Sequence, residues 1–417
     1  MVGAGVYTTS GFSLAMLQTP ERVIAAWAVG GVIAICGAIS YGALAGRFAQ
    51  SGGEYLFLSR AVHPAAGYVA GFVSILAGFT GATAFAASAL ESYLPRWTWM
   101  ESLPPGTVAC LVIIIAAISH GVYARVGTPL QNAMVVTKFI MLGIFFVVAA
   151  ASFPDRWEGL NVPSESAFEW SVFAVSLMWI SLSYSGFNAA IYVASEVRNP
   201  QINVPRSLWI ATLVVTLLYL LLNIVFVYAP ARESIVGQKE IAVITAISIG
   251  GENFGSFIRA VIVVSLATSV SAMMMSGPRV YAKMADDGVL PQWFRFQRDT
   301  PSTAIALQAL LAIAVVQVST LQELLSYLGF TLSLSAALTV ASIFLLRSKG
   351  KPIAVPFYPW PPLVFVVATV MVAGIAGFKQ PVECVCGLVT LGVGLVIYYV
   401  TPRSRLGSSH GNDSVTD

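Results

Sequence analysis

Two short stretches decide the fold: Val2-Gly3-Ala4-Gly5-Val6-Tyr7-Thr8-Thr9-Ser10-Gly11 and Ser183-Tyr184-Ser185-Gly186-Phe187-Asn188. Both place glycine and small polar residues inside long apolar segments. Glycine inside a helix weakens the helix by about 1 kcal/mol relative to alanine, so we expect both helices to be interrupted. In a bilayer, unwound backbone is tolerated only where it is buried in protein or lines a cavity. The two stretches therefore predict a binding cavity inside a membrane protein.

The composition of the chain supports a membrane location. Of the 417 residues, 57% are hydrophobic and only 10% are charged, and the mean hydropathy is +0.81. A soluble domain carries about 25% charged residues. A helix needs roughly 20 apolar residues to cross the hydrocarbon, so a chain of this length holds about twelve crossings. We expect an all-α membrane protein without a separate soluble domain.

About twelve apolar spans can be drawn between the prolines and polar loops of the chain. They cover residues 1–17, 23–48, 65–92, 105–123, 129–152, 168–195, 206–229, 255–283, 302–318, 322–346, 360–378 and 383–401. Residues 1–401 then form one transmembrane domain, followed by a polar tail at 402–417. Most of the 22 Lys and Arg residues fall on one side of this map, which the positive-inside rule assigns to the cytoplasm. Both termini are expected to be cytoplasmic, in a plasma (cell inner) membrane.

The two interrupted spans, 1–17 and 168–195, begin two successive five-helix halves. A pair of interrupted helices at corresponding positions is the best sequence indication of a transporter site. Helix N-termini direct partial positive charge at anionic groups, and free carbonyls bind cations. A molecule with an α-carboxylate and an α-ammonium suits this arrangement. The alternative is that the glycines only allow helices to pack closely.

Five motifs carry a family resemblance. Gly3-Ala4-Gly5-Val6-Tyr7 is similar to a G-[SA]-G-[IV]-[FY] signature, Gly52-Gly53-Glu54-Tyr55 to a G-G-x-Y element, and 183–188 to a break in helix 6. Residues 196–206 match E-x-x-N-P-x-x-N-x-P-R, and residues 279–291 match R-x(4)-M-A-x-D-G-x-L-P. Together they resemble the amino acid–polyamine–organocation (APC) superfamily, in particular its bacterial and L-type amino acid permeases. The resemblance covers nearly the whole chain, and the two loop motifs are the most specific.

The resemblance implies two inverted five-helix repeats followed by two further helices. It implies that backbone N–H groups near Ala4, Gly5 and Val6 bind the substrate carboxylate. The carbonyls expected to meet the ammonium lie near Met1, Leu182, Ser183 and Ser185. The family often has an aromatic gate two residues before the position of Tyr184, where this chain has Leu182, so Leu182 and Tyr184 are the candidate gating residues.

The start of the chain departs from the resemblance. The family has a cytoplasmic tail and the inner half of helix 1 before the glycine signature, whereas this chain begins two residues before it. We therefore expect helix 1 to lack its N-terminal half, through a truncated or misassigned start. If the start is genuine, the inner gate and some ammonium ligands are compromised.

Lys138 is an ionisable residue well inside the span 129–152. It lies roughly 13 Å from the start of that helix at 1.5 Å per residue. A charge inside the membrane costs at least about 2.5–3.5 kcal/mol, so a functional role is the default hypothesis. Snorkelling to the interface is the alternative. The resemblance supports function, because several members place a lysine here, where its ammonium replaces the cation of sodium-coupled relatives. Lys138 therefore favours proton coupling, or ion-independent exchange.

The side-chain pocket gives a weaker prediction of the substrate. Ala4, Leu182 and Ser185 favour a neutral amino acid or a small amine, with a polyamine- or ethanolamine-type permease as the alternative. We find no acid well inside the spans 1–17, 65–92, 168–195 or 255–283, which argues against cationic substrates. Glu54 and Arg198 lie in loops, either in a gate network or as solvated structural residues. Four hydroxyls of the span 255–283 could face the break in the span 1–17; they belong to Ser265, Thr268, Ser269 and Ser271.

Other functional classes find little support in the sequence. The three histidines and four cysteines follow no metal-ligand or disulfide spacing, so we expect no metal, cofactor or catalytic residue. A membrane-embedded enzyme and a channel are the rival classes, but enzyme motifs and a pore loop are missing. A net charge of +3 does not indicate a nucleic-acid partner. The expected partners are an amino acid or amine, the lipid bilayer and protons.

Overall fold

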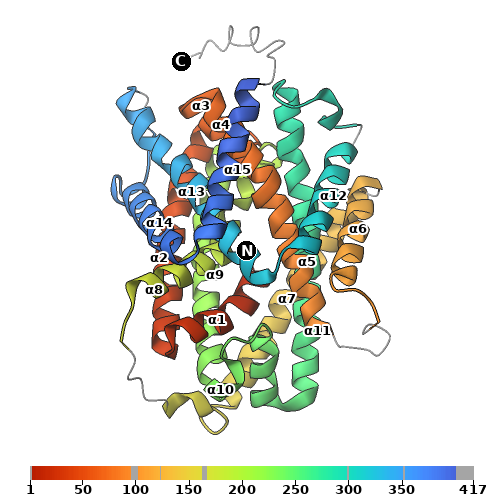
Figure 1. The fold of residues 1–417 in the computed structure, drawn as a ribbon, viewed down its shortest axis with the longest axis vertical. Coiled ribbons are helices and arrows are strands. Elements are labelled where there is room, and N and C mark those ends of the chain that lie inside the picture. The colour runs from red at the N-terminus through yellow and green to blue at the C-terminus, as the bar shows by residue number, and fades with distance from the viewer. Residues whose placement is uncertain are drawn as a thin grey trace.

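The computed structural model describes residues 2–94, 102–122, 124–161, 167–297, 300–350 and 353–400. Over these residues the fold is helical and contains no strand. Figure 1 shows most helices running along the long axis, with α3 at one end of the bundle and α10 at the other. Within the described residues, nine helices are long and apolar enough to cross a bilayer, and two shorter apolar helices accompany them. An all-α, multi-pass membrane protein is confirmed.

Most predicted spans coincide with single helices to within a few residues. These helices are α1 (Ala4–Leu17), α2 (Pro20–Arg47), α6 (Thr107–Val122), α7 (Ala124–Ala151), α9 (Pro200–Tyr228), α12 (Ser302–Val318), α13 (Leu321–Ser348), α14 (Trp360–Lys379) and α15 (Pro381–Val400). The predicted tail at 402–417 lies outside the described residues.

Capping chemistry explains several of the helix starts. Thr19 accepts a hydrogen bond from the backbone N–H of Arg22 at 3.4 Å, and Pro20 occupies the first turn of α2. Thr320 and Glu323 form a capping box at the start of α13. Such side chains satisfy N–H groups that have no acceptor inside the helix, so these boundaries are fixed locally by sequence.

Three predicted spans are composite in the structure. The span 65–92 consists of α4 (Pro64–Val73), a π-helical segment η1 (Ser74–Gly81) and α5 (Ala82–Tyr93). The span 168–195 consists of α8 (Trp170–Tyr184) and the 3₁₀ helix η3 (Ser185–Glu196). The span 255–283 lies inside α11 (Ile241–Asp286), which is bent at Gly251, where φ is 78°. Segments of π-helix occur frequently at functional sites.

The loops contain helices that the sequence did not predict. They are α3 (Gly53–Ala61), η2 (Glu158–Asn161), α10 (Arg232–Ile235) and η4 (Gln292–Phe294). At the start of α3, Gly52 and Gly53 have φ values of 141° and 59°. A Cβ at Gly53 would also collide with the ring of Tyr192. The two glycines therefore let the chain turn into α3 against η3.

The predicted interruptions are shorter than expected. Gly3 is extended, with φ −151° and ψ −155°, but α1 is a continuous helix from Ala4 onward. The prediction of unwound backbone is thus wrong for residues 4–11. Gly5 and Gly11 instead permit close packing, because a Cβ would collide with Ser183 and with the carbonyl of Gln238. In the second stretch the α-helix ends at Tyr184 and the backbone continues as a 3₁₀ helix rather than unwinding.

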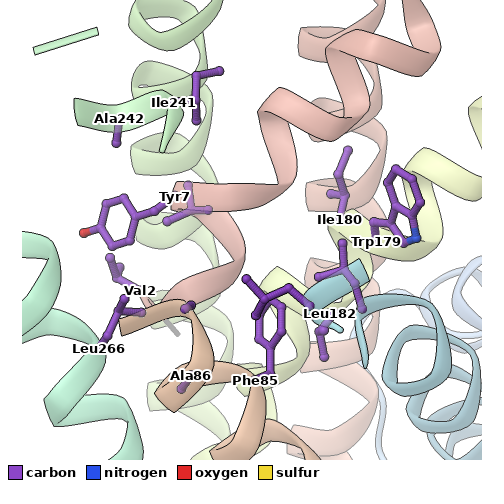
Figure 2. Packing of buried hydrophobic residues seen from close by; sticks show 14 of the residues in the cluster. Val2, Tyr7, Phe85, Ala86, Trp179, Ile180, Leu182, Ile241, Ala242 and Leu266 are labelled. Atoms are coloured by element: carbon purple, nitrogen blue, oxygen red, sulfur yellow. The ribbon is translucent and has the colours of Figure 1, made fainter. Parts of the chain in front are cut away.

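The short helix α1 lies at the centre of the core. It packs against α2, α5, α8, α9 and α11. Figure 2 shows Val2, Tyr7 and Leu266 on one side of this cluster, and Trp179, Ile180 and Leu182 on the other. The two stretches that were singled out in the sequence are therefore brought together inside the bundle.

Candidate functional site

A cavity of about 260 Å³ lies where the two stretches meet. Gly3 and Gly5 line it from the first stretch, and residues 182–188 line it from the second. Further wall residues come from α2, η1, α5, α11, α13 and α14, and they include Ile33, Ala34, Ser74, Phe79, Phe85, Ser269, Met273, Leu328, Ser333, Phe365 and Thr369. Figure 2 shows Phe85 beside Leu182 at this wall. The wall is chiefly apolar, with scattered hydroxyl groups.

The first turn of α1 supplies backbone donors at the cavity. Ala4, Gly5 and Val6 are the first three helical residues, and Gly3 provides no side-chain cap. N–H groups in this position have no intrahelical acceptor, and a helix start carries roughly half a positive charge. Gly5 lines the cavity, whereas the Val6 side chain is fully buried in the core. The structure describes only the backbone of Ala4.

The predicted residues of the second stretch all line the cavity, but the carbonyls of Leu182 and Ser183 are already engaged. The Leu182 carbonyl accepts a hydrogen bond from Ser185 Oγ at 2.7 Å, and the Ser183 carbonyl accepts one from Tyr219 Oη at 3.1 Å. Ser183 Oγ is buried and has no partner within the described part of the chain. The Leu182 carbonyl also accepts the Ser185 backbone N–H, so both of its acceptor positions are occupied, and Ser183 Oγ is the group of this stretch that is left for a ligand. Met1 lies outside the described residues.

Tyr184 is held in an aromatic cluster. Its ring lies 5.8 Å from that of Trp27 and 5.1 Å from that of Tyr219, measured between centroids. Its Oη donates to the Trp27 carbonyl at 3.3 Å, and the side chain is 1% exposed. A gating movement of Tyr184 would therefore have to break this packing. Leu182 is less constrained, because these aromatic contacts do not include it.

Lys138 reaches the start of helix 1. Its Nζ donates to the Val2 carbonyl at 2.9 Å, and the residue is 7% exposed. Snorkelling is wrong for this lysine, because its ammonium is bound to protein backbone inside the bundle. Lys138 does not line the cavity. It instead joins α7 to the extended residues that precede the free N–H groups of α1.

Glu54 was missed as a site residue. It lies in the first turn of α3, is 7% exposed and lines the cavity. Its carboxylate accepts hydrogen bonds from Tyr41 Oη at 3.1 Å, Asn188 Nδ2 at 2.6 Å and Tyr192 Oη at 2.7 Å. The alternative of a solvated residue is wrong for Glu54, whereas Arg198 is exposed. The sequence signal that could have identified Glu54 is its place inside the Gly52–Tyr55 motif.

The comparison with known families agrees with this geometry. The sequence profile of the family described as "Amino acid permease" matches residues 1–400. This chain belongs to the amino acid permease family. The permease is thus a membrane transporter and not an enzyme, as the motifs indicated.

Individual relatives of the permease are distant but span nearly its full length. The serine/threonine exchanger SteT of Bacillus subtilis is 23% identical, over 96% of this chain and 93% of that protein. The large neutral amino acids transporter small subunit 2 of Rattus norvegicus is 22% identical, over 96% of this chain and 78% of that protein. The b(0,+)-type amino acid transporter 1 of Mus musculus is 22% identical, over 98% of this chain and 86% of that protein.

The four hydroxyls predicted from the span 255–283, which lie on α11, are only partly brought to the site. Ser269 lines the cavity and donates to the Ser265 carbonyl at 3.1 Å. Ser271 pairs with His120 Nε2 at 2.7 Å, away from the cavity wall. Thr268 donates to the Ser265 carbonyl at 2.6 Å, and Ser265 is fully buried. Of the four predicted hydroxyls, only that of Ser269 can reach a molecule in the cavity.

Metal-binding groups are not gathered in the part of the permease that the structure describes. No set of three or more His, Cys, Asp or Glu side chains lies close enough there to hold a metal ion. The cysteines Cys36, Cys110, Cys384 and Cys386 are unpaired. The chemistry of the site is therefore that of backbone dipoles, hydroxyl groups, one lysine and one carboxylate.

Proposed function

We propose that this permease is a secondary active transporter that carries neutral amino acids across the membrane by alternating access. The observation that carries the proposal is the meeting of two helix ends, α1 at Ala4 and α8 at Tyr184, at one cavity inside the bundle. A helix N-terminus binds anions, and transporter sites typically lie where helix ends meet near the centre of the bundle. The names of the relatives, a serine/threonine exchanger and a large neutral amino acid transporter, support this substrate class.

The binding mode follows from the ends of these helices. The substrate carboxylate accepts hydrogen bonds from the N–H groups of Ala4, Gly5 and Val6. The ammonium of the substrate lies near the carbonyls of Met1, Leu182, Ser183 and Ser185, with Ser183 Oγ as a further partner. Leu182 and Tyr184 form the gate beside the substrate, and the apolar wall around Phe85 receives the side chain.

The wider architecture supports a transporter with two related halves. We propose that about twelve spans form two inverted five-helix repeats plus two helices, with both termini cytoplasmic in the plasma membrane. Residues 1–401 form one transmembrane domain, and 402–417 form a cytoplasmic tail. The nine long apolar helices of the described chain, the two shorter apolar helices α6 and α12, and the 14-residue helix α1 are the segments that we assign to these spans.

Lys138 is the proposed coupling residue. As an ammonium it holds the Val2 carbonyl, and so it fixes the segment that precedes the carboxylate-binding turn. Loss of the proton weakens this hydrogen bond, because hydrogen bonds from charged donors are stronger. Binding and release of a proton at Lys138 would thus favour different positions of helix 1. Proton symport and exchange both remain compatible with this role.

Uptake into proteoliposomes tests the function. A panel of labelled neutral amino acids, polyamines and ethanolamine is presented with and without an inward proton gradient, and with and without internal unlabelled substrate. We expect uptake of neutral amino acids that rises with the gradient or with internal substrate. Uptake of polyamines or ethanolamine alone would favour the alternative permease type. A channel would show no stimulation by internal substrate, and failure to take up or bind any member of the panel would overturn the proposal.

A further inference from the structure

The cavity wall carries one charge. Among the described residues that line it, Glu54 is the only charged side chain, and all others are apolar or neutral and polar. We propose that Glu54 sets the charge selectivity of the permease: it accepts zwitterions, favours an additional positive charge on the substrate and excludes an additional negative charge. This inference rests on the proposed transport of amino acids and refines its substrate class.

Among the residues that the structure describes, no cation forms an ion pair with Glu54. The three donors to the carboxylate, Tyr41, Asn188 and Tyr192, are all neutral. The nearby cations are engaged elsewhere: Lys283, which packs beside Gly52, pairs with Asp287 at 2.8 Å, and Arg279 pairs with Glu196 at 2.9 Å. Arg60, on α3 itself, is exposed. The carboxylate thus accepts hydrogen bonds from neutral donors only and has no cationic partner among the described residues.

A buried carboxylate of this kind has room for one more donor. Its two oxygens offer about four acceptor positions, and three are occupied. An ion buried without a counter-ion is costly, and an ammonium that enters the cavity removes that cost. A second carboxylate in the same cavity does the opposite, because like charges repel strongly where water is scarce. Glu54 alone therefore attracts substrates with an additional positive charge and repels substrates with an additional negative charge.

The position of Glu54 also complements the start of α1. The free N–H groups at Ala4 to Val6 give one part of the cavity positive polarity, and Glu54 gives another part negative polarity. An amino acid bound by its carboxylate at α1 can direct a distal amine at Glu54. The absence of an acid inside the spans had argued against cationic substrates, but α3 brings an acid to the cavity from a loop.

Pairs of size-matched competitors test this inference. Inhibition of labelled neutral amino acid uptake is measured with lysine against norleucine, and with glutamate against glutamine. In the wild type we expect lysine to compete at least as well as norleucine, and glutamate to compete poorly. In Glu54→Gln, which keeps the size of the side chain, the lysine-to-norleucine preference falls about tenfold and glutamate becomes a competitor. Glu233→Gln, which removes an exposed carboxylate on α10 at the other end of the bundle, is the matched control and keeps both ratios.

Several results would overturn the inference. Unchanged ratios in Glu54→Gln would do so, including the case in which only the pH dependence of uptake changes. If Glu54→Gln does not give a monodisperse protein, Glu54→Asp keeps the charge and must keep the exclusion of glutamate. If neither variant folds, the wild type decides: norleucine stronger than lysine by tenfold or more, with glutamate equal to glutamine, contradicts the inference. Wild-type protein that transports and binds no amino acid overturns the proposed function itself.

Discussion

At the scale of single residues, the contact between Lys138 and Val2 leads to the first prediction. Lys138→Met removes the hydrogen bond at 2.9 Å and the charge while keeping an apolar stem of similar length. Without the tether, the start of helix 1 loses its fixed position beside the carboxylate-binding turn. We expect uptake to fall at least about tenfold, which corresponds to about 1.4 kcal/mol, and to lose its dependence on pH.

Proteoliposome uptake between about pH 6 and 10, which includes the range in which lysine titrates, measures this effect, with external and internal pH varied separately. Lys138→Arg is the control, because it keeps a cation at the same place but does not release its proton in proteins. The arginine variant should retain the tether and lose the pH dependence. Full uptake with full pH dependence in Lys138→Met would contradict the coupling role.

The second residue prediction concerns the contact of Gly5 with Ser183. A Cβ at Gly5 would stand 2.8 Å from Ser183 Cα, which is backbone and cannot rotate away. Gly5→Ala therefore separates α1 from α8, distorts the cavity and lowers affinity for the substrate. Gly374→Ala on α14 is the matched control, because no atom lies within 4 Å of the added Cβ. In Gly5→Ala, but not in Gly374→Ala, the affinity for a transported amino acid and the temperature of thermal unfolding should both fall.

The sequence predicted some site residues and missed others for a clear reason. Gly5, Ser183 and Ser185 were found because small residues inside an apolar span are locally unusual, and Leu182 and Tyr184 were found through the family resemblance. Glu54 was missed because its burial depends on α3 folding onto η3, which is a tertiary event that hydropathy does not report. Val6 was expected to offer its backbone N–H to the substrate; its side chain lies in the core, and the role of its N–H stays a prediction.

At the scale of elements, α3 is tied to the end of α11. Tyr55 Oη donates to Asp287 Oδ2 at 2.8 Å, and Lys283 Nζ binds the other oxygen at 2.8 Å. Burial, and then the Asp287 carboxylate, raise the pKa of Tyr55 above its usual 10. Tyr55 therefore remains a donor at neutral and moderately alkaline pH, and it keeps α3, with Glu54 at its start, against α11.

Tyr55→Phe tests this tie. Loss of a hydrogen bond to a charged acceptor should lower stability by about 1.5–3 kcal/mol. Because the raised pKa favours the protonated phenol in the folded state, this contribution is fully present below pH 10 and is lost only above it. The difference in unfolding temperature between wild type and Tyr55→Phe should thus be constant from about pH 6 to pH 9. Tyr399→Phe, at an exposed ring, is the control; a difference that shrinks within this range would contradict the assignment.

The boundaries of the elements were predicted better than their internal geometry. Runs of apolar residues between prolines located α2, α12 and α14 closely, because length and hydropathy decide whether a segment spans a bilayer. The π-helical turn in η1 and the 3₁₀ helix η3 were not predicted, since their hydrogen-bond spacing is imposed by packing. The part of α11 before Gly251 was taken for a loop.

At the scale of the whole molecule, the cavity should be the transport path. Ser269 on α11 lines it, whereas Ser271, two residues further along and on a different side of the helix, is bonded to His120 and does not line it. We therefore expect bound substrate to slow the reaction of a thiol at position 269 with a thiol reagent. The reaction of a thiol at position 271 should not change when substrate binds. Both helix positions are partly buried, so general accessibility does not separate them.

The measurement uses Ser269→Cys and Ser271→Cys in a background without Cys36, Cys110, Cys384 and Cys386. Purified protein reacts with a small polar thiol reagent, which reaches both ends of the bundle, with and without a saturating transported amino acid. At position 269 the rate should fall at least about fivefold, because occupied cavity space excludes the reagent, whereas at 271 it should not change. Equal protection at both positions would point to a general closure of the bundle, and no protection at 269 would place the substrate outside this cavity.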